Sequence, residues 1–360
     1  MAMKALSRAT IYQVAQAAGV SIATVSRALR GSDLVTQQTR ERVLAAARQL
    51  QFTPSRLGRS LAEGRHAANG IVFPDLVGPY YAEVVLGYEA VAAGSGSSVL
   101  ILATNGRADA EAAVRDMASR VDGLTVMGQT VSDEFIAKLA ATGLPIVLLA
   151  RDPVPGVDTV RAENRKTAQA LVGHLLEHGH ERFVFLGDPD GAPDVRGRWS
   201  GVQAGLAKAG AARAHLVRIN GLDVEAGRAA ARELDDRPQA VICANDELAL
   251  GVLLERPQQT VTGWDDLMAA QFAGLTTVRQ PMRELGATAA RWLNRRITET
   301  GSGVTRSAVT DNTETDNTET DNTETDSTET DNAAAVRRRI LPTRLVIRTS
   351  CGTHSPEVHR

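Results

Sequence analysis

The sequence predicts a small all-α helix-turn-helix head followed by an α/β core of two parallel-sheet subdomains. The head is indicated by two capped helical segments that meet at a glycine near the N-terminus. The core is indicated by short apolar runs that alternate with helical stretches from Asn69 onward. These runs are continuous rather than alternating, which is typical of parallel strands covered by helices on both faces. A chain of 360 residues is long enough for two or three domains.

The two helices of the head are expected between Thr10 and Gly31. Thr10 and Gln13 form a capping box for a first helix over Ile11–Ala18, and Gly19 ends that helix. Ser21 is a good N-cap for a second helix. A structural helical hairpin with no partner is the alternative. The residues expected to face one small core are Val14, Ala15, Ala18, Val20, Val25, Ala28 and Leu29. A third helix is expected to follow, with its cap and buried stripe formed by Thr36, Val43, Leu44, Ala47 and Leu50.

The charge of the chain is divided unevenly. Up to Arg65 the sequence holds ten basic and three acidic residues, a net charge of +7. The whole chain carries −2, so the remainder carries −9. A compact basic head suits contacts to phosphates, whose strength falls steeply with salt.

A short basic segment follows the head. Pro54 breaks the helical pattern, and Ser55 to Ala62 could form only about two helical turns. Such a helix does not recover its nucleation cost alone in water, so we expect it to become ordered only with a partner. A plain linker is the alternative.

The apolar runs of the core predict strands. Since these are too many for one compact parallel sheet, we expect two similar subdomains with a cleft between them. The expected strands are Gly70–Phe73, Ser98–Ala103, Gly123–Met127, Pro145–Ala150, Phe183–Leu186, Leu216–Ile219, Ala240–Ala244, Val261–Trp264 and Arg344–Arg348.

Three strings in the head carry a specific resemblance. They are T-I-Y-Q-V-A-Q-A-A-G-V-S-I-A-T-V-S-R-A-L-R-G from Thr10, T-R-E-R-V-L-A-A-A from Thr39, and F-T-P-S-R-L-G-R-S-L from Phe52. In this order and spacing they resemble the DNA-binding headpiece of the LacI/GalR (lactose-repressor) family of transcription regulators. The core resembles the periplasmic-binding-protein-like module of that family from about Asn69 to Pro281, and again near L-P-T-R-L-V-I-R at residues 341–348.

The resemblance implies a domain organisation. It places the helix-turn-helix domain at residues 1–53 and a hinge helix at residues 54–66. The N-terminal subdomain is expected at 69–162 plus about 281–309, and the C-terminal subdomain at 163–280 plus about 336–352. The chain would then cross between subdomains near Ala162, near Gln280 and shortly before Arg339.

The resemblance also implies a way of binding DNA. The second helix would enter the major groove, with Ile22 and Ala23 reading the operator. The hinge helix would form on DNA and insert Leu61 into the minor groove. The residues expected to bind DNA are Thr10, Tyr12, Ser21, Ile22, Ala23, Thr24, Ser26, Arg27, Arg30, Arg56, Arg59 and Leu61.

For the cleft, the resemblance implies a bound small molecule. Aromatic, amide, carboxylate and guanidinium groups suit a sugar or a nucleobase-like effector. Ala150 and Leu222 depart from the residues that many members carry at these positions, so a ligand-independent regulator is an alternative. The segment from Glu247 to Val261 is also shorter than usual. The residues expected to bind the effector are Tyr80, Tyr81, Arg151, Arg196, Arg198, Asn245, Asp265 and Gln280.

An acidic repeat interrupts the core at residues 310–332. It repeats Asp-Asn-Thr-Glu-Thr with no basic and no apolar residue. Because such a run cannot bury enough surface to offset its ordering entropy, we expect a disordered surface loop. A solenoid or ion-binding repeat is the alternative. Its nine carboxylates are Asp311, Glu314, Asp316, Glu319, Asp321, Glu324, Asp326, Glu329 and Asp331.

Other functional classes find little support in the sequence. Two cysteines indicate no disulfide framework, and the N-terminal residues lack a signal-peptide core, so we expect a cytoplasmic protein. No run is long enough to span a membrane. We expect no cofactor and no metal, because His174, His178 and His180 have no cysteine or paired carboxylate near them in the sequence and look solvated. No catalytic set is evident, so an enzyme is not expected.

These observations together predict a homodimeric repressor that binds palindromic operator DNA and responds to a small molecule. A tetramer is not excluded, and the sequence does not say whether the effector induces or corepresses. The alternative from another class is the solute-binding protein of a transporter, which shares the core but not the basic head.

Overall fold

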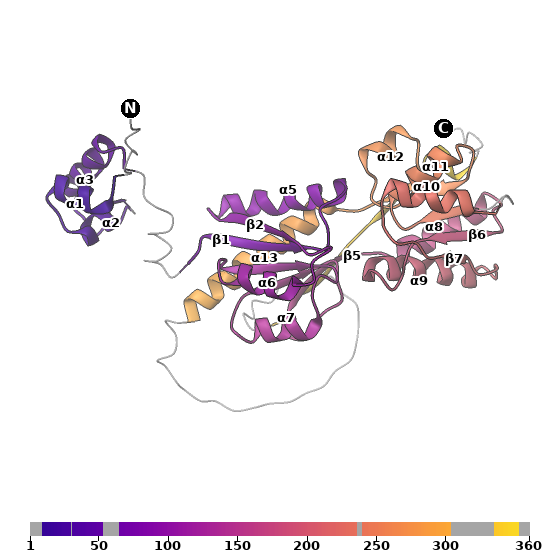
Figure 1. Cartoon of the computed structure of the whole chain (residues 1–360), viewed down its shortest axis with the longest axis horizontal. Coiled ribbons are helices and arrows are strands. Elements are labelled where there is room, and N and C mark those ends of the chain that lie inside the picture. The colour runs from indigo at the N-terminus through magenta and orange to yellow at the C-terminus, as the bar shows by residue number, and fades with distance from the viewer. Residues whose placement is uncertain (1–8, 30, 53–64, 236–239, 304–334, 353–360) are drawn as a thin grey trace, which may run out of the picture. The chain divides into compact units, whose positions relative to one another are not determined.

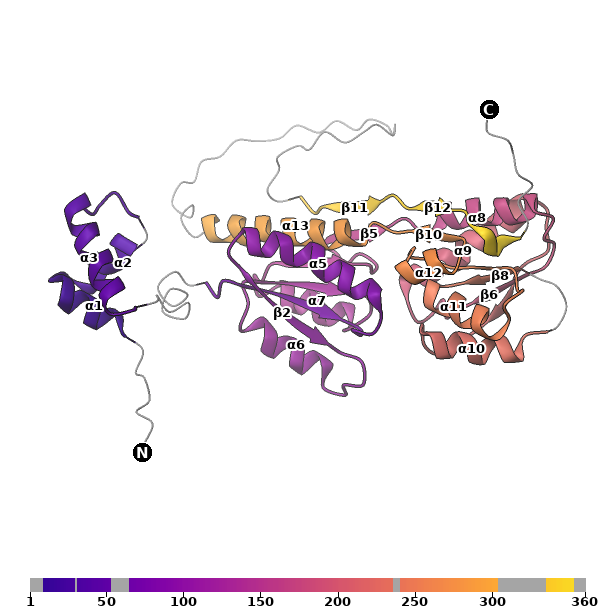
Figure 2. The same ribbon diagram turned by 90° about the horizontal axis from the view of Figure 1, so that it is seen from above.

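The computed structural model describes residues 9–29, 31–52, 65–235, 240–303 and 335–352 (Figures 1 and 2). It contains two compact units, residues 1–67 and residues 68–360, and each is described by itself. The predictions for the hinge segment, the acidic repeat, Arg30, Arg56, Arg59 and Leu61 lie outside the described residues. None of the helices in the described ranges is long and apolar enough to cross a membrane.

The described part of the head contains three helices, α1 (Ile11–Ala18), α2 (Ile22–Leu29) and α3 (Gln37–Gln49). The capping box forms as predicted: the Thr10 amide donates to Gln13 Oε1 at 2.8 Å and the Gln13 amide donates to Thr10 Oγ1 at 3.4 Å. Gly19 ends α1 with φ of 62°, a left-handed conformation that glycine adopts without strain. The buried core comprises Val14, Ala15, Ala18, Val25, Ala28, Val35, Val43, Ala46 and Ala47.

The predicted stripe of α3 was wrong at Leu44, whose side chain is 36% exposed. Ala46 is buried in its place, and Leu50 packs partly against the core. The physical reason is the helical period: Val43 faces the core, and the residues three, four and seven positions later share its face, whereas Leu44 is turned away by about 100°.

The N-terminal subdomain contains a six-stranded sheet in the order β11-β5-β4-β3-β1-β2, with every pair parallel. The strands are nearly all buried except at the sheet edges, in agreement with helices on both faces. Its strands are β1 (Ala68–Phe73), β2 (Ser98–Ala103), β3 (Gly123–Met127), β4 (Ile146–Leu149), β5 (Asp158–Ala162) and β11 (Arg338–Leu341). Its helices are α5 (Pro79–Gly94), α6 (Ala110–Ala118), α7 (Asp133–Ala140) and α13 (Met282–Gly303).

Helices α5 and α13 lie side by side on this subdomain (Figures 1 and 2). A glycine on each helix permits a close approach of the two backbones. A Cβ on Gly87 would lie 1.9 Å from the Arg283 carbonyl oxygen, and a Cβ on Gly286 would lie 2.0 Å from the Val84 carbonyl oxygen. Neither position can therefore hold a larger residue without separating the helices.

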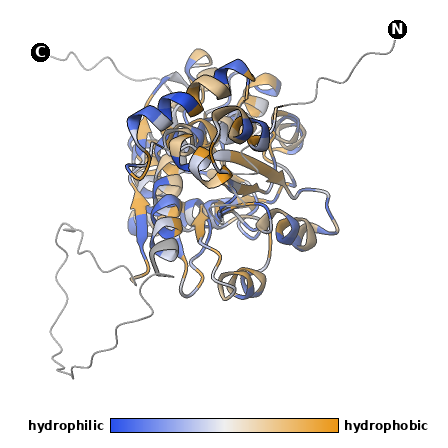
Figure 3. Cartoon of the chain, turned by 90° about the vertical axis from the view of Figure 1, so that its left-hand side faces the viewer, coloured by the Kyte–Doolittle hydropathy of each residue, from blue (hydrophilic) through white to orange (hydrophobic). Residues whose placement is uncertain are grey.

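The C-terminal subdomain contains a parallel four-stranded sheet in the order β7-β6-β8-β9 and a separate antiparallel pair of β10 and β12. Figure 3, which shows the whole chain from another side, has helices with both hydrophilic and hydrophobic residues, as expected when one face of a helix is buried. Its strands are β6 (Phe183–Leu186), β7 (His215–Val217), β8 (Ala240–Cys243), β9 (Val261–Thr262), β10 (Thr277–Arg279) and β12 (Arg344–Val346). Its helices are α8 (Arg165–Glu177), α9 (Pro193–Lys208), α10 (Val224–Glu233), α11 (Asp246–Glu255), α12 (Met268–Phe272) and the 3₁₀ helix η1 (Thr349–Cys351).

Residues from about 336 were predicted to belong to the C-terminal subdomain, and this was wrong for β11. Strand β11 pairs with β5 in the N-terminal sheet, in the register Leu341↔Ala162, so the last crossing follows Leu341 rather than preceding Arg339. Neither β11 nor β5 was predicted, and β10 was also missed. The run R-R-R-I-L has no apolar pattern because β11 is an edge strand, and its charged side chains remain exposed.

A buried carboxylate fastens β11 to the subdomain. Asp158 Oδ1 accepts from Arg296 Nη2 at 2.7 Å and from the Arg337 amide at 2.7 Å. Its Oδ2 lies 3.3 Å from Arg337 Nη1. The Asp158 side chain is fully buried, whereas the Arg296 and Arg337 side chains are 20% and 16% exposed. This charge cluster joins α13, β5 and the segment that leads into β11.

Replacement Asp158→Asn should lower the free energy of unfolding by about 3 kcal/mol, because it removes the buried carboxylate that both guanidinium groups share and leaves them their more exposed partner Glu299. Urea unfolding of the full chain measures this loss. The matched control is Asp116→Asn, which breaks an exposed pair with Arg120 and should cost less than about 1 kcal/mol. Equal losses in the two variants would contradict the role of the buried cluster.

Candidate DNA-binding helix and ligand cavity

Helix α2 presents an exposed face at its first turn. Ser21 Oγ accepts from the Thr24 amide at 3.1 Å and lies 2.9 Å from the Thr24 hydroxyl, so it caps the helix. Val25 and Ala28 are buried on the opposite face. Ile22 is 40% exposed, and the side chains of Ala23 and Arg27 are also accessible. The helix therefore offers a short row of side chains to a groove of DNA.

The other predicted DNA-binding residues of the head divide by exposure. Tyr12 is 69% exposed and Thr10 is exposed, whereas Thr24 and Ser26 are half-buried. The residue that follows α2, Arg30, lies outside the described part of the chain. Nothing in the structure contradicts these predictions, and their contacts with DNA stay predictions.

A cavity of about 680 Å³ lies between the two subdomains of the core. This volume suits a small polar ligand. Its wall includes residues that follow β1, β2, β3 and β4 on one side and residues near α9 and after β8 and β9 on the other. The carboxyl ends of the parallel strands of both sheets therefore face this space, which is where open α/β sheets bind ligands.

Two aromatic side chains form one part of the wall. Tyr80 and Tyr81 lie in the first turn of α5, which begins at Pro79. Their rings are 5.5 Å apart and nearly perpendicular, and Tyr81 packs against Phe73 at 5.6 Å. Burial raises the pKa of Tyr81 to about 12, so its hydroxyl keeps its proton at neutral pH and can donate a hydrogen bond.

Arg198, on α9, stands on the opposite wall and is 6% exposed. Its Nε donates to Asn164 Oδ1 at 2.8 Å, and its Nη1 donates to the Ala244 carbonyl. Its guanidinium carbon lies 4.8 Å from the centre of the Trp264 ring. Within the described chain these contacts use Nε and Nη1, which leaves Nη2 for a ligand.

Asp265 faces the same cavity and is 4% exposed. Its Oδ1 accepts from Gln280 Nε2 at 2.6 Å. Burial raises the pKa of Asp265 to about 8, although the nearby Arg198 opposes the shift. A carboxyl group that holds its proton can both donate and accept a hydrogen bond. This property suits a ligand with hydroxyl or amide groups.

Asn245 also lines the cavity, but its amide has local partners. Its Oδ1 accepts from the Leu248 amide at 3.0 Å and caps α11. Its Nδ2 donates to the Leu222 carbonyl at 2.7 Å. The structure therefore gives Asn245 a positioning role, and one amide hydrogen remains for a ligand.

Three predicted effector residues do not line the cavity. Arg151 is buried and donates to Asp133 and to the Val131 carbonyl, and Arg196 donates to Asp152. Gln280 lies behind Asp265 and holds it. Sequence position placed these residues near strand or helix ends, but it could not show that their side chains turn away toward carboxyl partners.

The cavity also contains residues that sequence reasoning missed. Asp75 and Asn105 follow β1 and β2, and Asn105 Nδ2 donates to Asp75 Oδ2 at 2.7 Å. Asp194, Asp223 and Glu247 come from the other subdomain. The position of Asp75 and Asn105 directly after predicted strands was a usable signal, since carboxyl ends of parallel strands meet at one edge.

Two wall residues have an unusual backbone. Ala150 has φ of 50° and Asp265 has φ of 122°, and both are non-glycine residues in a region that L-residues rarely adopt. Such conformations cost free energy and occur often at ligand sites. Their presence on both sides of the cavity supports its assignment as a binding site.

The histidine cluster was predicted to be solvated and to have no cysteine near it, and this was wrong. His174 and His178 are half-buried, and His174 Nε2 lies 3.2 Å from the sulfur of Cys351. The contact joins residues 177 positions apart in the sequence. Sequence spacing alone could not show it, because it depends on the return of the C-terminal segment to α8.

The fold and these two sites define a class of protein: a helix-turn-helix DNA-binding regulator of transcription with a small-molecule cavity in a two-subdomain core. Residues 10–55 match the family of bacterial regulatory proteins of lacI type, and residues 66–319 match the periplasmic binding proteins and sugar-binding domain of that family. The chain belongs to the LacI family.

Curated relatives and solved structures agree with this membership. The transcriptional repressor CytR of Escherichia coli (strain K12) is 32% identical over 80% of this chain and 89% of its own length. The repressor PurR of Photobacterium profundum is 29% identical over 81% of this chain and 92% of its own length.

Two solved structures share the fold. The lac repressor dimer bound to operator and the anti-inducer ONPF has a TM-score of 0.78, with 23% identity over 96% of this chain and 99% of that one. The complex of the regulator CelR with cellobiose has a TM-score of 0.63, with 26% identity over 95% of this chain and 100% of that one.

The pKa of Asp265 predicts a pH dependence of stability. The raised pKa of about 8 means that the folded chain holds a proton which the unfolded chain releases near the ordinary value of 3.8. Stability should therefore fall as pH rises between these values. Replacement Asp265→Asn should reduce the slope of the free energy of unfolding by up to about 1.4 kcal/mol per pH unit.

Urea unfolding between about pH 5 and pH 8 measures the two slopes. The exposed Asp109, whose side chain is 68% exposed, gives a matched control as Asp109→Asn, which should keep the slope of the parent chain. An unchanged slope in the Asp265→Asn variant would mean that this carboxyl group is ionised in the folded protein.

Proposed function

We propose that this chain is a repressor that binds a palindromic operator as a homodimer and that a polar small molecule in the cavity changes its affinity for DNA. The relatives CytR and PurR, both named as repressors, support repression. A single exposed helical turn offers few base contacts, and two copies related by a twofold axis double them and fix the spacing of the half-sites. This action would take place in the cytoplasm, where the operator is.

Each head residue has a proposed role that follows from its exposure and chemistry. Ile22 and Ala23 read bases through methyl and van der Waals contacts, while Arg27 bonds a phosphate or a guanine edge. Thr24 and Ser26 contact phosphates, and Thr10, Tyr12 and Ser21 contact the DNA backbone. The roles of Arg30, Arg56, Arg59 and Leu61 remain predictions, since these residues lie outside the described chain.

The observation that carries the effector proposal is the presence of two buried polar side chains, Arg198 and Asp265, in the wall of one cavity. Each has protein partners for part of its hydrogen-bonding capacity, and a ligand with several hydroxyl or amide groups would use the rest. Tyr80 offers an aromatic face for the ring of a sugar or nucleobase. The sugar complex of CelR favours a sugar.

A route for coupling follows from contacts between the two subdomains. Arg196, on α9, donates to Asp152, which follows β4 in the other subdomain. Gly78, at the start of α5, lies where a Cβ would come 2.5 Å from Glu247 Oε2. A ligand between the subdomains would shift these contacts and so the position of one subdomain against the other. We infer a regulatory rather than a catalytic role for the cavity.

The two alternatives are a ligand-independent regulator and the solute-binding protein of a transporter. Ala150 and Leu222 both line the cavity and remove polar or aromatic groups expected from the resemblance, which favours a ligand-independent regulator. The match of residues 10–55 to the regulatory headpiece speaks against a transporter protein.

Selection of bound DNA from a random pool, with and without a panel of sugars and nucleobases, tests both parts of the proposal. We expect enrichment of one palindrome, and we expect at least one compound to change its recovery. Recovery of no palindrome would contradict operator binding. A palindrome whose recovery no compound changes would favour the ligand-independent regulator.

Substitution of head residues should separate base reading from phosphate binding. Ile22→Asn should change the preferred base at one half-site position, because Asn can bond an adenine edge. Arg27→Ala should lower affinity by about 1–3 kcal/mol. Fluorescence anisotropy with the selected palindrome and single-base variants measures these effects. The control Arg48→Ala, in the exposed last turn of α3, should keep the preferred sequence; loss of that preference in the control would undermine the assignment to α2.

Asp265→Ala should lower the affinity for the selected compound about 10–100-fold, because it removes a buried hydrogen-bonding partner. Operator affinity without the compound should stay within about 3-fold, since the cavity lies outside the head. Isothermal titration and anisotropy give the two values. Glu225→Ala, a change on an exposed residue of α10, is the control and should alter neither. Unchanged binding of the compound to the Asp265→Ala variant would place the effector elsewhere.

A further inference from the structure

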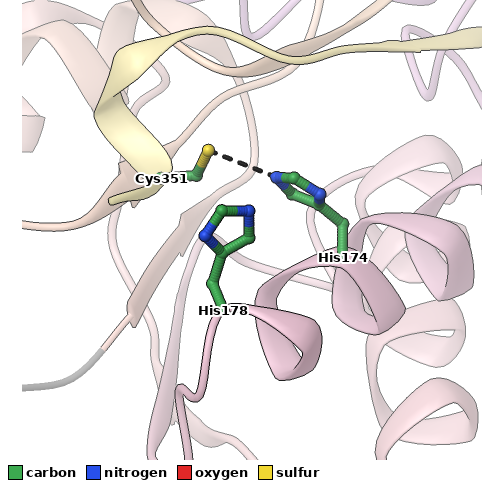
Figure 4. Close-up of side chains that lie close together, drawn as sticks. All are labelled: His174, His178 and Cys351. Atoms are coloured by element: carbon green, nitrogen blue, oxygen red, sulfur yellow. Dashed lines mark hydrogen bonds between the residues drawn. The ribbon is translucent and has the colours of Figure 1, made fainter. Parts of the chain in front are cut away.

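The cluster of His174, His178 and Cys351 lies outside the ligand cavity, since none of the three residues lines it. His174 lies in the last turn of α8 and His178, four positions later, is the C-cap of that helix, so the two rings lie on one side of its end. The centres of the two rings are 4.5 Å apart. The third member, Cys351, is fully buried in η1 and comes from the far end of the chain. Figure 4 shows both imidazole rings beside the cysteine sulfur.

We propose that these three side chains form a binding site for a single zinc ion, with water in the fourth position. Two imidazole nitrogens and one thiolate are ligands that Zn²⁺ prefers, and a cysteine with two histidines matches known zinc chemistry. The cluster offers no carboxylate, which disfavours Ca²⁺ and Mg²⁺. The proposal goes beyond DNA and effector binding and does not depend on either.

The distances between the donor atoms support the proposal. In a tetrahedral zinc site with bonds of about 2.0–2.3 Å, neighbouring donor atoms are about 3.3–3.7 Å apart. His174 Nε2 and Cys351 Sγ are 3.2 Å apart, and all three donor atoms lie within 4.8 Å of one another. A side-chain rotation of His178 would be needed to bring its ring nitrogen from within 4.8 Å of the other two donor atoms to the separation of a tetrahedral site.

Groups around the cluster hold the cysteine in place. The Thr276 hydroxyl donates toward the Cys351 sulfur at 3.1 Å, and His180 Nε2 lies 3.0 Å from the Cys351 carbonyl oxygen. The same Thr276 hydroxyl accepts from the Arg348 amide at 2.8 Å. Such outer contacts orient metal ligands and stabilise the thiolate. A zinc ion here would cross-link the C-terminal segment to α8, two parts of the C-terminal subdomain that lie far apart in the sequence.

Competition between the purified full chain and a chromophoric zinc chelator tests the site. We expect one Zn²⁺ per chain. Removal of a first ligand in Cys351→Ser or His178→Ala should weaken binding by more than the roughly 10–100-fold typical of an outer-shell change. The matched control His215→Ala changes an exposed histidine at the start of β7 and should bind as the parent chain does. Equal zinc affinity in all four proteins would overturn the proposal.

The Co²⁺ complex provides a second readout that does not rely on affinity. The parent chain should show a sulfur-to-cobalt charge-transfer band and the strong visible absorption of a tetrahedral site, and Cys351→Ser should lack the charge-transfer band. Far-UV circular dichroism and operator binding show whether each variant folds. If Cys351→Ser fails to fold, the zinc affinity and the Co²⁺ spectrum of the His178→Ala variant decide the question. A parent complex without a thiolate band would leave only a hydrogen-bonded cluster and reject the metal site.

Discussion

The polar wall of the cavity depends on one buried carboxyl group, that of Asp265. Burial raises the pKa of Asp265, while the hydrogen bond from Gln280 and the charge of Arg198 favour its ionised form. Arg198 is held in turn by Asn164 and by the Trp264 ring. These groups belong to the C-terminal subdomain, and the aromatic pair Tyr80 and Tyr81 belongs to the other. Both subdomains supply wall residues, so the fit of a ligand that contacts both sets would depend on the relative position of the subdomains.

The order of the domains along the chain suggests how ligand binding in the cavity would affect DNA binding. Three connections join the two subdomains, and the helix-turn-helix unit precedes the first strand of the N-terminal subdomain. The head is therefore connected along the chain to the N-terminal subdomain. Since a ligand and an operator would favour or disfavour the same arrangement of the subdomains, each would change the affinity for the other by the same factor. The architecture requires no contact between ligand and DNA.

Much of the fold could be predicted from local sequence patterns, and the exceptions have physical reasons. The caps at Thr10 and Gly19 and the apolar strands over Ser98–Ala103 and Gly123–Met127 were predicted because local chemistry determines them. Strand β11 was missed because an edge strand needs no apolar pattern. In the cavity, Tyr80, Arg198 and Asp265 were predicted from the family resemblance, whereas Asp194 and Glu247 were not. The contact of His174 with Cys351 depends on tertiary folding and left no signal in the spacing of the residues.

The measurement that tests the central claim most directly is the affinity of the free chain and of the operator-bound chain for the same effector, by isothermal titration at one salt concentration. The account predicts that the two affinities differ by the same factor by which saturating effector changes the affinity for the operator. Equal effector affinities in the two states would contradict a cavity coupled to DNA through the subdomains.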